Sequence, residues 1–160
     1  MDQNVCRETL SGMFVEEAGL LAQLEDLLDR EQEVLKSKDV AAINATALER
    51  QQRIGALARL EEQRRSLCTL HGQTPDLHGL EKMMGWCDPK GTLISRMREC
   101  AERAARCRDL NDRNGTLVNA RLKRVEGLLN VLTGRSSSVH TYGPKGACTP
   151  ARSGRVLGAA

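Results

Sequence analysis

The stretch from Thr92 to Thr133 contains no proline and has glycine only at Gly115 and Gly127. Stepping from Leu93 by alternating fours and threes marks a row of positions with a mean spacing of about 3.5 residues. This is the spacing of a helix that packs against other helices along one narrow line of residues, here called the seam. These positions are Leu93, Met97, Cys100, Ala104, Cys107, Asn111, Asn114, Val118, Arg121, Val125, Leu128 and Leu132. A helix of this length would extend roughly 60 Å at about 1.5 Å per residue. The spacing therefore predicts an elongated helical bundle rather than a compact globule.

Two more amphipathic stretches precede this helix. Residues 2–36 carry two adjacent apolar rows, which predicts a helix that contacts two partners. The rows are Leu10, Met13, Leu20, Leu24, Leu27 and Val34 in one, and Phe14, Leu21, Leu28 and Leu35 in the other. After a short break that offers Ser37 or Asp39 as N-cap, residues 40–71 predict a second helix. A connection this short makes the two helices an antiparallel hairpin.

Glycines and prolines interrupt the helical spacing between residues 71 and 91. Thr74 followed by Pro75 predicts an N-cap and first helical residue, and hence a short helix at about 76–85. This helix would pack apolar side chains across one end of the bundle, namely Met83, Met84 and Trp86. The expected fold is therefore all-α: an antiparallel hairpin or bundle of three long helices, with a short cross-connecting helix.

The composition changes at Gly134 to glycine, serine, proline and basic residues with few apolar anchors. This change predicts a helical domain at 1–133 and a flexible, disordered tail at 134–160. The tail contains four basic residues and no acidic one, whereas the rest of the chain is nearly neutral. A nucleic-acid-binding domain would gather Lys and Arg on one face, so we expect no nucleic-acid partner.

Several other classes of protein are disfavoured by composition. The chain has only three aromatic residues, Phe14, Trp86 and Tyr142, and no apolar run long enough to cross a membrane. Its first residues show no signal peptide, so we expect a cytoplasmic protein without direct membrane insertion. The six cysteines form no CxxC pair and no zinc spacing, and no phosphate loop or nucleophile–base arrangement occurs. We therefore expect no enzyme, no cofactor and no metal.

Asn111 and Asn114 fall on seam positions of the long helix, and Gly115 follows directly. Buried asparagines at such positions usually fix helix register or partner number at a cost in stability. A glycine inside a helix costs about 1 kcal/mol relative to alanine, and one reason to keep it is close approach of another backbone. These three residues are the predicted polar layer of the bundle.

Three segments of the chain resemble the FlgN-type flagellar export chaperones. They are Asp109-Leu110-Asn111-Asp112-Arg113-Asn114-Gly115, the aliphatic run that follows it through Leu132, and Tyr142-Gly143-Pro144-Lys145-Gly146 in the tail. That family shows Leu-Asn-x-x-Asn-Gly in its last long helix and Tyr-Gly-x-x-Gly in a flexible tail. A helix that ends near Glu61-Glu62-Gln63-Arg64-Arg65 is also similar. Lys145 departs from the family, which commonly has Asp there, so a role based on charge at this position is in doubt.

The resemblance implies a cytosolic, non-enzymatic chaperone of the flagellar type III export system. Such proteins bind the C-terminal segments of hook–filament junction (hook-associated) proteins, prevent their premature assembly and help deliver them to the export gate. By the same resemblance, Tyr142 and Gly143 are expected to dock on the cytoplasmic domain of that gate.

The expected client surface is a set of residues in the second half of the long helix, which we call the aliphatic strip: Leu117, Val118, Leu122, Val125, Leu128, Leu129 and Leu132. These residues cover more of the helix circumference than one seam needs, so some should remain exposed on the free protein. Two alternatives stay open. The strip could be bundle core, or it could pair with a second copy in a self-associating structural coiled-coil protein.

Overall fold

The computed structural model describes residues 2–37 and 39–133, and these residues form four helices and no strand. The helices are α1 (Gln3–Ser37), α2 (Val40–Leu70), α3 (Leu77–Cys87) and α4 (Thr92–Leu132). The predicted all-α fold is confirmed, and the predicted helices agree with the observed ones to within two residues at each end. The chain divides into two compact units, Met1–Leu122 and Lys123–Ala160, and the packing below is that of the first.

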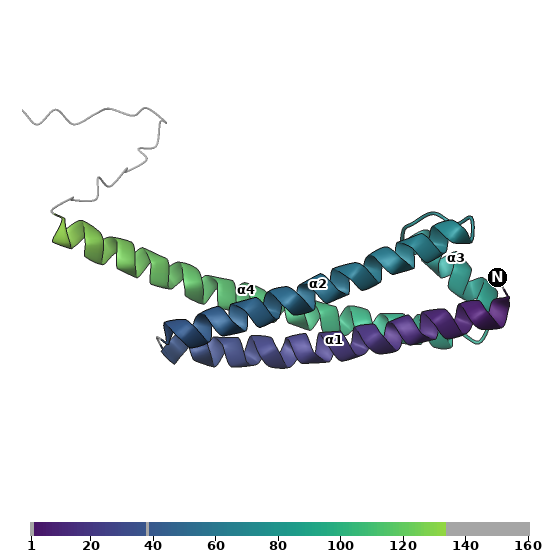
Figure 1. Ribbon diagram of the computed structural model, residues 1–160, viewed down its shortest axis with the longest axis horizontal. Helices are drawn as coiled ribbons and strands as arrows, with labels where there is room; N and C mark the ends of the chain where they lie inside the picture. The colour runs from purple at the N-terminus through teal and green to yellow at the C-terminus, as the bar shows by residue number, and fades with distance from the viewer. Residues whose placement is uncertain (1, 38, 134–160) are drawn as a thin grey trace, which may run out of the picture. The chain divides into compact units, whose positions relative to one another are not determined.

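Helices α1 and α2 lie side by side and run antiparallel, as Figure 1 shows. The break between them places Asp39 as the N-cap of α2, where its Oδ1 accepts a hydrogen bond from Ala42 N at 3.0 Å. A capping carboxylate accepts a hydrogen bond from one of the free N–H groups of the first turn, and its negative charge interacts favourably with the positive end of the helix dipole. Of the two N-caps that the sequence offers, the structure therefore uses Asp39.

Helix α3 begins differently from the prediction, because Asp76 rather than Thr74 is its N-cap. The Asp76 carboxylate accepts a hydrogen bond from Gly79 N at 2.8 Å, and the Thr74 hydroxyl donates to the same oxygen at 2.7 Å. Thr74 thus supports the cap from outside the helix. These two hydrogen bonds hold the pKa of Asp76 below its usual value. Pro75 precedes the cap instead of opening the helix.

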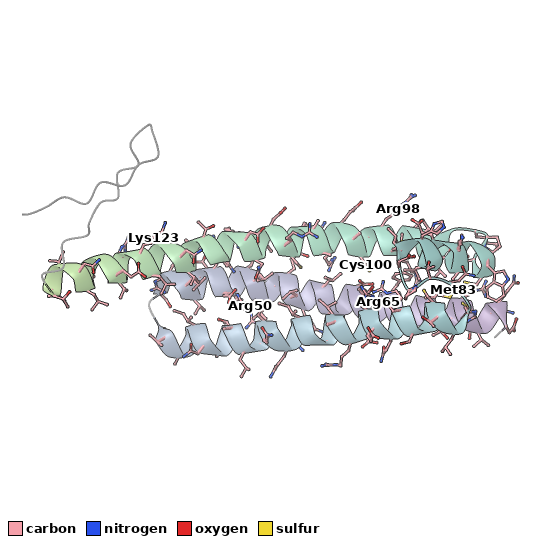
Figure 2. The ribbon with its side chains drawn as sticks, turned by 90° about the horizontal axis from the view of Figure 1, so that it is seen from above. Arg50, Arg65, Met83, Arg98, Cys100 and Lys123 are labelled. Carbon is pink, nitrogen blue, oxygen red and sulfur yellow. The ribbon has the colours of Figure 1, made fainter. Side chains whose placement is uncertain are left out.

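The core of the first unit is apolar and is shared by all four helices. In the view of Figure 2, α1 lies between α2 and α4, which accounts for its two apolar rows. Both methionines predicted for α3 are buried, whereas Trp86 is 45% exposed and lies with its ring centroid 5.8 Å from that of His71. The core residues are Cys6, Leu10, Phe14, Leu21, Leu24, Leu28, Leu67, Cys68, Leu80, Met83, Met84, Cys87, Leu93, Cys100 and Cys107.

A tight turn joins α3 to α4. Asp88 is buried, and its Oδ2 accepts a hydrogen bond from Leu93 N at 2.7 Å in the first turn of α4. Gly91 has a φ of 75°, a left-handed conformation that glycine adopts without steric cost. The turn therefore fixes where α4 starts relative to α3 and, through the core, to α1.

Candidate partner-binding surface

Helix α4 packs on α1 through a contact that repeats every seven residues. The thiol of Cys100 donates to the carbonyl oxygen of Phe14 at 3.7 Å, and that of Cys107 donates to Leu21 O at 3.5 Å. The Asn114 side chain continues the series, because its Nδ2 donates to Leu28 O at 2.8 Å. Each pair is 86 residues apart in sequence, so the two helices run parallel with a constant register. Figure 2 places Cys100 on the side of α4 that faces α1.

Small side chains make this contact possible. Leu93, Cys100, Cys107 and Asn114 are the buried residues of α4, and they lie at strict seven-residue spacing. Burial raises the pKa of both seam thiols. They are therefore protonated at neutral pH and act as small apolar side chains with a weak S–H donor.

Charged pairs flank the seam. Arg106 Nε lies 3.2 Å from the Glu25 carboxylate, and Arg113 Nη2 lies 3.1 Å from Asp29. Closer to the start of α4, Arg96 Nη1 donates to Ser11 Oγ at 2.8 Å. Parallel helices align their dipoles unfavourably, and these pairs offset part of that cost. Because the pairs are partly exposed, each is worth at most about 1 kcal/mol.

The last buried residue of α4, Asn114, belongs to a polar layer that joins three helices. Its Nδ2 also donates to Glu31 Oε2 at 3.1 Å, and Glu31 is only 3% exposed. The two carboxylate oxygens of Glu31 accept hydrogen bonds from Arg50 Nη1 at 2.8 and 2.9 Å. Figure 2 shows Arg50 between α2 and α1. The sequence analysis identified Asn114 but missed Glu31 and Arg50, because an acidic residue on an apolar row looks like a solvated one.

The other two residues of the predicted polar layer lie elsewhere. Asn111 is exposed, since the contact with α1 follows one residue per heptad rather than two. Gly115 is also exposed, and a Cβ added to it would meet no atom within 4 Å. Among the described residues no backbone approaches Gly115 closely, so the close approach is not made within this part of the chain. The role of Asn114 in helix register stays a prediction.

The aliphatic strip lies on α4 beyond this layer. Six of its seven residues are exposed, from 40% at Val118 to 81% at Leu132, and Leu117 is half-buried. Val131, which the sequence analysis did not include, is 79% exposed on the same segment. Exposed apolar side chains also occur singly on the other helices, as at Val15 and Leu48. The concentration on one helical segment is what distinguishes the strip, because large apolar patches on a free protein usually mark interaction sites.

Residues at steps of three and four along the strip offer the anchors that a helix-in-groove contact uses. Lys123, Arg124 and Glu126 are exposed between them. A partner helix could therefore bury aliphatic side chains against the strip and keep charged side chains at its edges. Such a surface can bind and cover an amphipathic helix.

A separate cleft of about 220 Å³ lies in the first unit and has Arg64 in its wall. Arg64 donates to Glu17 at 3.0 Å and to Glu61 at 3.2 Å, and its guanidinium carbon lies 5.4 Å from the centroid of the Phe14 ring. These contacts join Arg64 to carboxylates of α1 and α2 and to an aromatic ring of α1. They indicate a role in holding α2 on α1.

The remaining predictions concern metals, membranes and the tail. In residues 2–37 and 39–133, no group of three or more metal-ligating side chains is arranged to hold an ion. The helices of this part of the chain include none with the length and apolar character of a membrane span. Tyr142 and Gly143, predicted to dock on the export gate, lie outside the described residues, as does Cys148. The five other cysteines are buried free thiols.

Comparison with known families identifies the chain. The family described as FlgN protein matches residues 1–150. No curated protein and no solved structure matches the chain. The match covers nearly the whole sequence and agrees with the resemblance noted in the Asn-Gly segment of α4. The protein therefore belongs to the FlgN family of bacterial flagellar export chaperones, which bind flagellar proteins.

Proposed function

We propose that this protein is a cytoplasmic chaperone that binds the C-terminal amphipathic helices of hook–filament junction proteins through the aliphatic strip. It prevents their premature assembly, delivers them to the type III export gate and catalyses no reaction. The observation that carries the proposal is the exposure of the strip, from Val118 to Leu132, on a helix whose earlier residues are packed against α1.

The physical reason is complementarity of two incomplete surfaces. An amphipathic helix that pairs only in the assembled filament exposes its apolar face before assembly, and such faces aggregate. The strip offers a matching face without aromatic anchors or a deep pocket. Since aromatic and arginine anchors carry most of the energy of tight interfaces, we expect moderate affinity and therefore reversible binding.

The test is a pull-down with the C-terminal segment of a hook–filament junction protein. The double variant Val125→Asp, Leu129→Asp places two charges in the strip and should reduce client binding at least tenfold. The matched control is Val15→Asp, Leu48→Asp, which charges two slightly more exposed apolar residues outside the strip and should bind normally. Circular dichroism must show native helix content in both variants.

Two outcomes would overturn the proposal. Normal binding by a folded strip variant would remove this surface. In sedimentation experiments, a tight dimer that client peptide does not dissociate would instead favour a self-associating structural protein, which would use the same exposed face. A monomer that forms a complex with the peptide supports the chaperone function.

A further inference from the structure

The last layer of the α1–α4 seam is polar although apolar residues lie beside it. Asn114 is 1% exposed, whereas Leu117 in the next turn is half-buried and Val118 is exposed. Leu110, one turn earlier, is only partly buried. A small rotation of α4 about its axis would bring Leu110 and Leu117 onto α1 and turn Asn114 away. Burial of apolar area alone would favour that rotation.

Stability does not explain the choice of asparagine here. The Oδ1 atom of Asn114 is buried and has no hydrogen-bond partner, and an unpaired buried acceptor loses its hydration without compensation. The two bonds of its Nδ2, to Leu28 O and Glu31 Oε2, need one particular orientation of α4. Buried polar residues at seam positions are best known for selecting one arrangement of helices among several.

The rotation of α4 about its own axis needs a contact that selects one orientation at the level of Asn114. A straight α-helix drifts by about 20° per heptad relative to a seven-residue seam, so three heptads from Leu93 to Asn114 accumulate about 60°. The Asp88 turn fixes the start of α4 and restrains sliding along α1. Between that turn and Asn114, Cys100 and Cys107 contact α1 only through long bonds from weak thiol donors, whereas Asn114 is the first residue of the series that contacts it through a strong donor at 2.8 Å.

We propose that Asn114 and Glu31, with Arg50 holding the Glu31 carboxylate, are positioning residues that set the rotation of α4 on α1. This rotation decides how far the first residues of the aliphatic strip, Leu117, Val118 and Leu122, are uncovered. The strip begins three residues after Asn114, so a rotation at this layer changes which of these three side chains are uncovered. The consequence for client binding rests on the proposed function, whereas the rotation itself does not.

Two pairs of introduced cysteines report the rotation in the full chain carrying Cys148→Ser. The native pair is Asp29→Cys with Arg113→Cys, at positions that form an ion pair. The rotated pair is Asp29→Cys with Thr116→Cys, where Thr116 is exposed. A short bis-maleimide cross-linker and mass spectrometry of the linked peptides give the yield of each. With the native seam, the yield of the native pair should exceed that of the rotated pair about fivefold, because residue 113 lies nearer to α1.

Asn114→Leu should lower the ratio of the two yields at least threefold while the protein stays folded. Glu31→Leu, which removes the partner rather than the asparagine, should act in the same direction. Glu31→Gln retains an acceptor for Asn114 Nδ2 and should preserve the ratio. The matched control is Cys107→Ala, one heptad earlier, which removes a seam donor but keeps a small side chain, and it should also preserve the ratio.

If the Asn114→Leu protein has native helix content and an unchanged ratio of the two cross-linking yields, the proposal is overturned, whether or not this variant still binds the client. A lower ratio together with weaker client binding would support it. A lower ratio with unchanged client binding would overturn the link to the strip. The charged strip variant, Val125→Asp, Leu129→Asp, tests the proposed function without altering this layer, so failure of one inference is distinguishable from failure of the other.

Discussion

The thiol of Cys107 on α4 lies 3.5 Å from the carbonyl oxygen of Leu21 on α1. A side-chain atom so close to a neighbouring helix backbone requires a small residue at this position. The same contact recurs one heptad earlier between Cys100 and Phe14. The cysteines of α4 thus serve close parallel packing.

Arg64 is expected to be more important for stability than its neighbour Arg65. Arg64 is buried between Glu17 and Glu61, whereas Arg65 is exposed and pairs only with Glu61. Arg64→Ala removes the partner of Glu17 and the packing over Phe14, and it should lower the free energy of unfolding by roughly 2–4 kcal/mol. Arg65→Ala should cost less than about 1 kcal/mol. Urea unfolding of both variants makes the comparison, and equal losses would contradict this assignment.

Two glycines of α3 should respond oppositely to alanine. A Cβ on Gly79 would collide with the backbone of Thr74, including its carbonyl oxygen, whereas a Cβ on Gly85 would meet nothing within 4 Å. Gly79→Ala should therefore destabilise the protein by about 2 kcal/mol or more. Gly85→Ala should stabilise it by about 0.5–1 kcal/mol, because alanine favours the helix. Thermal unfolding distinguishes them, and a stable Gly79→Ala protein would mean that the Thr74 turn adjusts freely.

Alkaline pH should weaken the core through its buried thiols. Burial raises the pKa of Cys6 from 9.0 to about 12. The folded protein therefore holds this proton more tightly than the unfolded chain does. The contribution of the protonated Cys6 thiol to the free energy of unfolding is therefore complete below pH 9, and it is lost as the pH rises towards about 12. At about pH 10 the loss should be roughly 1 kcal/mol.

Urea unfolding across this pH range would measure the effect. Cys6→Ala should lower stability at neutral pH, because it leaves a small cavity, but should show a flatter decline above pH 9. The slopes of the two proteins are compared because every other titrating group is common to both. Parallel slopes would indicate that the Cys6 thiolate is tolerated in the fold.

Tyr142→Ala should weaken binding to the cytoplasmic domain of the export gate at least tenfold and leave client binding unchanged. The expectation follows from the resemblance of the Tyr-Gly-Pro-Lys-Gly segment to the tail of the family. Titration of the purified gate domain, with and without client peptide, measures it. Ser137→Ala, in the same tail, is the matched control. Loss of both gate and client binding would show that the tail also contributes to the client surface.

Helix positions were predictable because local signals determine them. Seven-residue spacing, glycine and proline breaks and the capping residues Ser37 and Asp39 placed all four helices. The cap of α3 was assigned to Thr74 instead of Asp76, because either side chain can accept a hydrogen bond and only the backbone conformation distinguishes them. Asn111 was placed in the seam beside Asn114 because both fit a two-per-heptad repeat. In the structure α4 buries one position per heptad, and spacing alone does not reveal whether one or two positions of a heptad are covered.

The amino-acid sequence by itself determined that this chain forms long amphipathic helices, and it placed their ends to within two residues, since periodicity and capping act over a few residues. It also carried the resemblance to the FlgN family that the whole-chain match confirms. The parallel register of α4 on α1 and the joining of Glu31, Arg50 and Asn114 into one layer depended on tertiary packing. Those contacts connect residues that are distant along the chain, and they form only when three helices meet.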